Sequence, residues 1–348
     1  MRRELVNWSI VLGLIIGAFV TTVIVLNSTL YGSSGFVRSY LGALARHDMA
    51  SALTIADIHL PEEHGAASDD GSGATPIDTT GAGSMLLAGS HDLLRPSSLS
   101  SLEDIAVVES KINADGTETV TFTFELDGRS AQSTFTVQRS GSRFGVFADW
   151  EFVTVPLTIV RLTVANAQEF TANGTEFVAP SQDTPSSYVV LTPSSFNITH
   201  TSTFLKAESI VVSATEPGGT VRARLDVVAN EAMIAQVQRK VDDYLDECAT
   251  QVVLLPTGCP FGQPMANRIV TTPEWSIAVY PPVSLVPGPE PASWLMPATG
   301  AAAHLRVDVR SIFDGSVSTF DQDMSFTTSY LVTFLPNDHL LITDQYPN

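Results

Sequence analysis

Few residues of this sequence could carry out chemistry as a group. His59 and His64 flank Glu62 and Glu63 in the phrase HLPEEH, and imidazole and carboxylate are ligand types that zinc accepts. The five-residue spacing does not place both imidazoles on one face of a helix, and Pro61 interrupts the segment. We therefore predict no metal site here.

The motifs that mark common catalytic sites are absent from the sequence. There is no G-x-S-x-G, S-x-x-K, H-E-x-x-H or phosphate-binding G-x-x-x-x-G-K pattern. Asp69, Asp70 and Gly71 lack the ordered ligand repeat of an EF-hand loop. The sequence thus predicts a protein that is not an enzyme, with no catalytic residue and no bound cofactor.

Cys248 and Cys259 are the only two cysteines. The first ends a predicted helix, and the second lies in a Pro/Gly turn eleven positions later. We predict that they form a disulfide that pins the intervening loop to the helix; two unpaired buried thiols are the alternative. No nearby His or basic cluster would activate either thiol for catalysis.

One apolar stretch, residues 8–26 (WSIVLGLIIGAFVTTVIVL), predicts where the rest of the chain is placed. A helix of roughly 20 apolar residues spans the ~30 Å core of a bilayer. Arg2 and Arg3 precede it, which predicts a cytoplasmic N-terminus and an extracytoplasmic remainder. A cleaved signal peptide is the alternative, but its apolar region is typically about 7–15 residues and ends at a small-x-small site. We predict an uncleaved signal anchor in the cell membrane, with the lipid bilayer as a partner.

Gly13 and Gly17 form a GxxxG pair within that stretch. Such a pair lets two membrane helices approach closely, which makes both residues candidates for transmembrane packing. The alternative is that both are ordinary glycines of a membrane helix.

Composition excludes some functions and bounds the size of the fold. With 348 residues, of which 44% are hydrophobic and 16% charged, the chain is folded and has room for two or three domains. Lys and Arg number 18 against 37 Asp and Glu, a formal net charge of −19. Such an acidic surface argues against nucleic acid as a partner.

The first part of the remaining chain has a helical pattern followed by a strand pattern. Residues 36–56 have apolar residues at helical spacing, with Asp48 placed to cap the second of two helices. From Ile105 the period changes to two, and Asp115-Gly116 and Asp127-Gly128 mark turns. This order predicts an α+β layer with helices on one face of an antiparallel sheet.

The second part of the chain is predicted to be mostly strands. Residues 154–215 contain short strand patterns with a hairpin signal at Asn173-Gly174. A single amphipathic helix follows over 231–249, with Asn230 as its cap. Alternating strands then continue to the C-terminus, which repeats the order of helix and sheet.

The phrase FVRSYLGALARHDMASAL, followed by hairpins that end in FGVFADWEF, resembles NTF2-like domains of actinobacterial single-pass membrane proteins. Residues 154–215 are similar to a PEGA-like surface β-module. The resemblance implies helices packed on a curved antiparallel sheet that encloses an apolar cone. In such a cone Tyr40 and Asp48 are the pocket candidates for proton transfer. Their competing roles are structural, with Tyr40 on the buried stripe of a helix and Asp48 as an N-cap.

Together these patterns predict an α+β fold, an N-terminal transmembrane helix followed by NTF2-like domains with a small β-module between them. The predicted order is a cytoplasmic N-terminus (1–7), the transmembrane helix (8–26), a spacer (27–35), an NTF2-like domain (36–153) with a flexible loop (64–83), the β-module (154–215) and a second α+β domain (216–348). We predict a membrane-anchored extracytoplasmic scaffold or binding protein whose partners are envelope proteins or a second copy. A small-ligand receptor and a cone-type acid/base enzyme are the alternatives.

Overall fold

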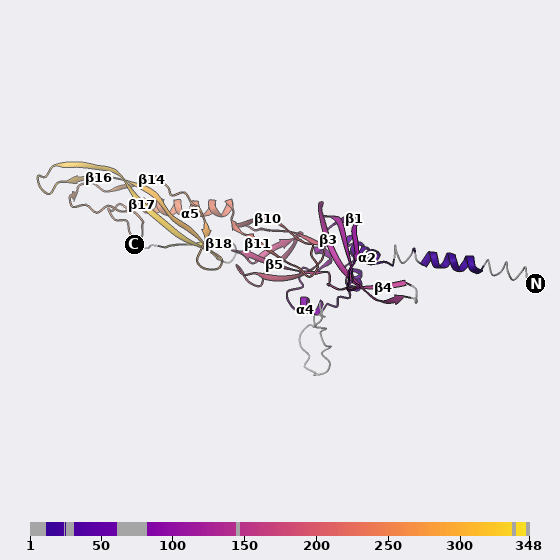
Figure 1. Cartoon of the computed structure of the whole chain (residues 1–348). Helices are drawn as coiled ribbons and strands as arrows, with labels where there is room; N and C mark the ends of the chain where they lie inside the picture. Colours follow the sequence, from indigo (N-terminus) through magenta and orange to yellow (C-terminus); the bar gives the residue numbers. More distant parts are fainter. Residues whose placement is uncertain are drawn as a thin grey trace, which may run out of the picture. The chain divides into compact units, whose positions relative to one another are not determined.

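The computed structural model describes residues 12–23, 25, 31–60, 82–143, 147–335 and 339–345 (Figure 1). The chain forms two compact units. Unit 1 comprises Met1–Thr163, Glu169–Ile198 and Ser209–Leu225, and unit 2 comprises Val164–Gln168, Thr199–Glu208 and Asp226–Asn348. Neither unit is one continuous segment, because the chain passes from one to the other several times.

Strands dominate the fold, with 48% of residues in strands and 20% in helices. The described helices after residue 25 are α2 (Ser33–Ala45), α3 (Met49–Ile55), α4 (Ala82–Leu86) and α5 (Glu231–Ala249), with a 3-10 turn η1 (Pro96–Ser98). The strands up to α5 are β1 (Leu102–Ile112), β2 (Glu118–Leu126), β3 (Arg129–Arg143), β4 (Phe147–Phe152), β5 (Leu157–Ala165), β6 (Glu169–Ala172), β7 (Thr175–Val178), β8 (Ser186–Leu191), β9 (Ser194–Thr201), β10 (Leu205–Ala214), β11 (Thr220–Asp226) and β12 (Val228–Ala229). After α5 follow β13 (Arg268–Ile269), β14 (Glu274–Val279), β15 (Val286–Pro287), β16 (Ser293–Arg310), β17 (Val317–Leu335) and β18 (His339–Asp344).

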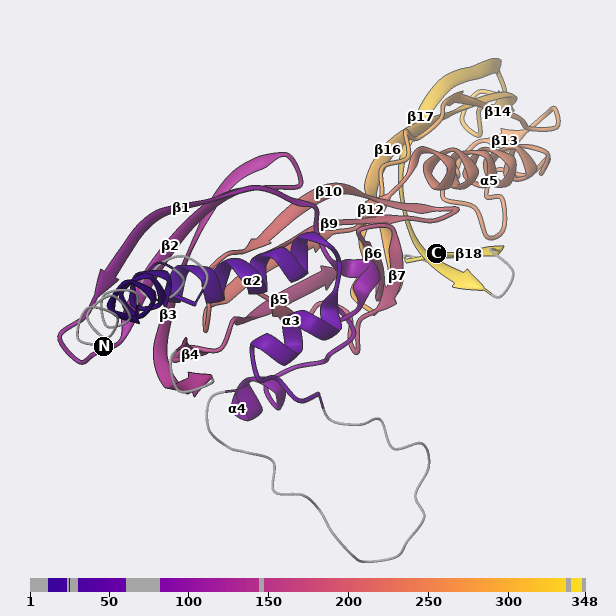
Figure 2. The same ribbon diagram turned by 90° about the vertical axis from the view of Figure 1, so that its right-hand side faces the viewer.

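In unit 1 the helical hairpin predicted over 36–56 is confirmed as α2 and α3. Val37, Tyr40, Leu41 and Leu44 recur at intervals of three and four residues, and all four are buried. This stripe packs α2 against the sheet formed by β1 to β4 (Figure 2). The two helices are joined by a tight turn that ends at the cap of α3.

The first sheet of unit 1 is an antiparallel meander in the order β1-β2-β3-β4. Asp127 and Gly128 connect β2 to β3, with φ angles of 49° and 71°. Two consecutive positive φ values are typical of the type I′ turn, whose twist matches that of the flanking strands. The turn thus fixes the register that pairs Leu126 with Arg129 and continues to Glu118 and Val137.

Two further sheets contribute to unit 1. One is a three-stranded sheet in the order β11-β5-β8. The other is a five-stranded sheet in the order β12-β10-β9-β6-β7, of which β12 belongs to unit 2. The Asn173-Gly174 turn joins β6 to β7 with φ angles of 49° and 79°, as the hairpin signal predicts. Residues of β5 and β8, namely Leu157, Val189 and Leu191, are buried in the same core as α2 and the meander.

The NTF2-like α+β prediction is wrong. The fold is mostly β, and its curled sheet is a half-barrel that does not match NTF2-like domains behind a membrane helix. The physical reason lies in the core of unit 1, where β5 and β8 supply apolar surface alongside two short helices. Periodicity shows that a strand has an apolar face, but it does not show whether a helix or another strand covers that face.

Unit 2 is built around α5 and the sheet that contains β13 to β18. Asn230 caps α5, since its side chain accepts a hydrogen bond from the Met233 amide at 3.0 Å. The sheet order is β13-β16-β17-β18, and β14 and β15 also pair with β16. Its core joins Met233, Val237, Val241 and Leu245 of α5 to the inner face of the sheet.

The membrane anchor predicted over 8–26 is not supported. Residues 12–23 and 25 are helical, and residues 8–11, 24 and 26 of the predicted span lie outside the described residues. In the part of the chain that the structure describes, no helix has both the length and the apolarity to cross a membrane. This overturns the predicted signal anchor, single-pass topology and cell-membrane location.

Candidate interaction surface

Tyr40, the first predicted pocket residue, is completely buried in α2. Its hydroxyl donates a hydrogen bond to the Thr192 carbonyl oxygen at 2.8 Å and lies 3.4 Å from the Pro156 carbonyl oxygen. Burial raises the pKa of Tyr40 above its ordinary value, although the bond to Thr192 opposes this. The phenol therefore stays protonated at neutral pH and acts as a structural donor rather than as a base.

Asp48, the second pocket candidate, is the N-cap of α3. Its carboxylate accepts a hydrogen bond from the Ser51 amide at 3.1 Å. Hydrogen bonds from the Ser51 side chain and amide hold the pKa of Asp48 below its ordinary value, and Arg46 contributes in the same direction. Asp48 is thus an ionised cap that orders the start of a helix, which is the structural role that its position predicts.

The HLPEEH segment is only partly described. The side chain of His59 is 88% exposed and lies 3.9 Å from Asp57, while Glu62, Glu63 and His64 are outside the described residues. Among the residues with described positions, no group of three or more His, Cys, Asp or Glu could hold a metal ion.

Cys248 and Cys259 form a disulfide in unit 2, with their Cα atoms 5.8 Å apart. Both are buried, and the bond joins the end of α5 to the loop that precedes β13. Gly13 and Gly17 both lie in the helical residues 12–23. A Cβ atom added at either glycine would meet no described atom within 4 Å.

The strands β16 and β17 form a long hairpin in unit 2. Its register runs from Arg310 and Val317 at the turn to Ser293 and Thr333 at the far end, with one irregularity between Met296 and Thr299. Alternate residues of β16 face the core, and the buried ones near the turn are Ala301, Ala303, Leu305, Val307 and Val309. The residues between them face outward and are polar from position 304 to the turn.

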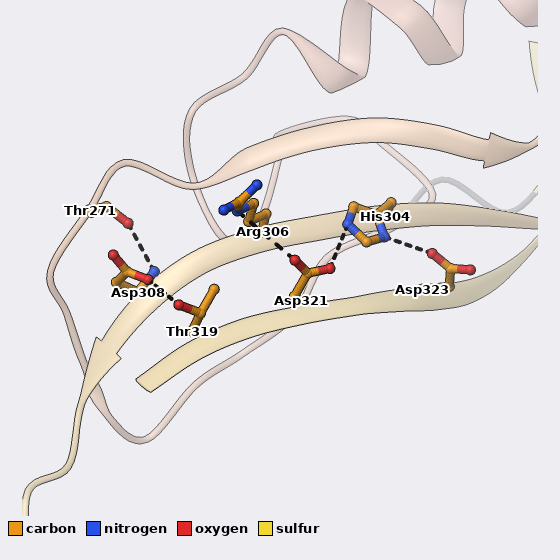
Figure 3. A network of polar contacts seen from close by, with 7 residues as sticks. All are labelled: Thr271, His304, Arg306, Asp308, Thr319, Asp321 and Asp323. Carbon is orange, nitrogen blue, oxygen red and sulfur yellow. Dashed lines mark hydrogen bonds and ion pairs between the residues drawn. The ribbon is translucent and has the colours of Figure 1, made fainter. Parts of the chain in front are cut away.

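A charged network covers this outer face (Figure 3). His304 Nδ1 lies 2.8 Å from Asp323 Oδ1, and His304 Nε2 lies 3.1 Å from Asp321 Oδ1. Arg306 Nε lies 3.9 Å from Asp321 Oδ2. These contacts follow from the register, which pairs His304 with Asp323 and Arg306 with Asp321.

The network continues toward the turn. Thr319 donates a hydrogen bond to Asp308 Oδ1 at 2.6 Å, and these two residues are also directly paired. The Asp308 amide donates to the Thr271 hydroxyl at 2.9 Å. The seven residues of Figure 3 thus join β16, β17 and the segment before β14 on one surface.

Ser276, His304 and Asp323 are directly paired across β14, β16 and β17, an order of residue types found in nucleophilic catalysis. The geometry does not support that use. A general base must accept the serine proton on its free ring nitrogen, but His304 Nε2 faces the Asp321 carboxylate. Both ring nitrogens of His304 thus face carboxylate oxygens, and neither is left open toward Ser276. The His304 contacts therefore suit a charged binding surface.

Each ion pair of this network lies at the surface. The side chains of His304, Asp321 and Asp323 are 34%, 52% and 63% exposed. Exposed ion pairs contribute about 0.2–1 kcal/mol each, because water screens them and ordering the side chains costs entropy.

The turn of the hairpin presents apolar side chains to solvent. Phe313 is 95% exposed and Ile312 is 65% exposed. The turn is nevertheless ordered, because Asp314 accepts hydrogen bonds from the amide and hydroxyl of Ser316 at 3.1 and 2.9 Å. Hydrogen bonds from Ser311 and Ser316 hold the pKa of Asp314 below its ordinary value.

None of these hairpin residues is among the predicted site residues. The sequence does contain a signal for them, since polar residues alternate with apolar ones at 304, 306 and 308, and Asp321 and Asp323 are two positions apart. The alternation predicts strands with one polar face. It does not show that the two polar faces become neighbours, because that depends on the register.

No protein-family model, no curated protein and no solved structure matches this chain. Its function must therefore be argued from its own surfaces and contacts.

Proposed function

We propose that this chain is a non-enzymatic binding protein that holds a partner protein through the β16–β17 hairpin of unit 2. The single observation that carries the proposal is the side chain of Phe313, which is 95% exposed on a turn ordered by Asp314. An exposed aromatic side chain on a rigid support loses little conformational freedom on binding and buries a large apolar area. Such residues are frequent energetic anchors of protein interfaces.

The surroundings of Phe313 extend this surface. Ile312 and Val317 are 65% and 55% exposed on either side of the turn, and the charged network begins with Asp308 and Thr319. An apolar centre with a polar border is the usual anatomy of a protein interface. The residues with catalytic potential, by contrast, have structural partners, as with the Tyr40 hydroxyl and both His304 nitrogens.

A photo-crosslinking amino acid at position 313 of the full chain tests the proposal in the source cells. The control is the same substitution at Val252, which is 61% exposed in unit 2 just after α5. We expect one protein to crosslink at 313 and not at 252. With that purified partner, Phe313→Ala should weaken binding by about 2 kcal/mol, roughly thirtyfold, while Val252→Ala has little effect. No crosslink at 313, or equal crosslinking at both positions, would contradict the proposal.

A second candidate function, a receptor for a small molecule, is favoured by a different observation. Trp294 Nε1, Thr328 Oγ1 and Tyr330 OH are buried in unit 2 and have no hydrogen-bond partner of ordinary geometry in the described chain. Buried polar groups are normally paired, so an unpaired set marks where a polar solute or water would bind. Native mass spectrometry of the purified chain tests it, and a small molecule that is retained by the wild type and lost from Trp294→Phe supports it.

A further inference from the structure

The strand β17 has one edge that is largely unpaired. One edge of β17 pairs with β16 along nearly its full length. On the opposite edge, β18 pairs only with residues 330–335. The Gln345 amide donates to the Ser329 carbonyl oxygen at 3.0 Å and extends that pairing by one contact. Among the described residues, no strand pairs with residues 317–328 on this side. Alternate backbone amides and carbonyls of this edge therefore face away from the hairpin.

The unpaired edge lacks the lysines and prolines that often block strand addition. The segment VSTFDQDMSFTT contains no Pro, Lys or Gly, and it has one Val, three Thr and two Phe, which favour strands. Natural edge strands are usually short, or they are protected by lysines, prolines or bulges. Residues 317–328 form an edge of roughly 40 Å at about 3.4 Å per residue.

The charge beside this edge favours cations. Asp321 and Asp323 are the charged residues of the segment, and both lie on its outer face with exposed carboxylates. His304 and Arg306 of β16 contact them from the paired side, which leaves the open side without a cation in this segment. The net charge of −19 attracts basic partners over longer distances.

A second copy of this chain fits the edge poorly. Antiparallel pairing of β17 with itself must place outer residues opposite outer residues, and the two such registers that pair most of the segment have their two-fold axis at residue 322 or 323. The first register sets Asp321 opposite Asp323 of the other copy, and the second sets Asp323 opposite Asp323. Like charges that are directly opposite each other destabilise a strand pair.

From these observations we infer that the partner segment adds to the open edge of β17 as an extended strand carrying Lys or Arg at alternate positions. Its backbone would pair with residues 317–328, and its basic side chains would lie on the outer face beside Asp321 and Asp323. Strand addition derives affinity from main-chain hydrogen bonds and specificity from alternate side chains. This inference rests on the proposed function, for which it names the chemistry of the partner.

Synthetic peptides of about ten residues, a length that covers most of the edge, provide the probe. One alternates Lys with Thr, and its control has Glu in place of Lys. Two further versions of the Lys peptide carry backbone N-methyl groups at the odd or at the even positions. Only every second amide of an added strand faces its neighbour. Methylation of the amides that face β17 should therefore abolish binding to the full chain, whereas methylation of the amides that face away should leave binding unchanged.

The charge component is tested with paired variants of the full chain. Asp321→Asn together with Asp323→Asn should weaken binding of the Lys peptide about fivefold or more. The control variant, Asp243→Asn with Glu247→Gln, removes two charges from the exposed face of α5 and should leave that affinity unchanged. Binding is measured by isothermal titration at low and high salt, and circular dichroism verifies that each variant is folded.

Any one of three peptide-binding results would overturn the inference: no binding of the Lys peptide, equal binding of the two methylated peptides, or equal binding of the Lys and Glu peptides. Self-association in sedimentation that is competed by the peptide would assign the edge to a second copy and would likewise overturn it. Failure here leaves the crosslink at position 313 intact. Conversely, peptide binding without a crosslink at 313 would remove Phe313 as the anchor and retain the edge.

Discussion

The hydroxyl of Tyr40 donates to the carbonyl oxygen of Thr192 across 152 positions of sequence, at 2.8 Å in the core of unit 1. This bond joins α2 to the segment after β8, two elements that no local pattern connects. The hydroxyl also does what a phenylalanine at this buried position could not, because Thr192 is completely buried and its carbonyl needs a donor.

Tyr40→Phe should therefore destabilise the protein. Loss of the hydroxyl leaves the Thr192 carbonyl without this donor, and such a loss costs about 1–3 kcal/mol. Guanidinium denaturation of the two proteins measures the difference in the free energy of unfolding. An unchanged midpoint would show that the bond contributes nothing.

Tyr330→Phe in unit 2 is the matched comparison and should behave in the opposite way. Burial is the main cause that raises the pKa of Tyr330 above its ordinary value, with Tyr244 and Asp344 adding to it. The Thr328 hydroxyl lowers the pKa of Tyr330, but this is the smallest of the four effects. Among the described residues, the hydroxyls of Thr328 and Tyr330 have no hydrogen bond of ordinary geometry. Removing an unpaired buried hydroxyl should leave stability unchanged or raise it by about 1 kcal/mol. A loss as large as that of Tyr40→Phe would reveal a partner for Tyr330, such as a bound water.

The lowered pKa of Asp48 should make the protein less stable at acid pH. The pKa of this carboxyl in the folded state lies below the ordinary value of 3.8, so the folded protein holds the proton less tightly than the unfolded chain does. The contribution of the cap is complete above pH 3.8 and declines as the pH falls through the lowered folded value. Thermal melts of wild type and Asp48→Asn between neutral pH and pH 2 measure this, because Asn caps a helix without titrating. Stability curves that remain parallel across that range would contradict the prediction.

The disulfide should stabilise unit 2. Replacing Cys248 and Cys259 with Ala frees a loop that the bond closes over 11 positions, and the chain-entropy value for a loop of this size is about 2–3 kcal/mol. Denaturation with and without reductant checks the value. The reduced wild type should match the double variant, and reductant should not alter the variant itself.

The sequence by itself determined the local structure of this protein. Helical spacing and the capping residues Asp48 and Asn230 predict α3 and α5, because both signals act within a few residues. The Asp127-Gly128 and Asn173-Gly174 turns are predicted for the same reason, since the φ angles they need are a property of those residues.

Hydropathy is a weaker guide, as the N-terminal segment shows. The apolar run over 8–26 predicts a membrane helix, but none of the described helices meets the length and apolarity that a span requires. The resemblance to NTF2-like domains likewise concerns two helices and a meander, whereas the class of the fold depends on what covers each sheet.

Only the tertiary structure decided which strands became neighbours. The packing of β5 and β8 against α2, and the pairing of His304 with Asp323, both depend on contacts between distant residues. Many pairings satisfy the same alternation of polar and apolar residues, and a shift of one residue exchanges the two faces of a strand. The choice is made by the burial of the whole core, and that choice created the charged face and the open edge on which the proposed function depends.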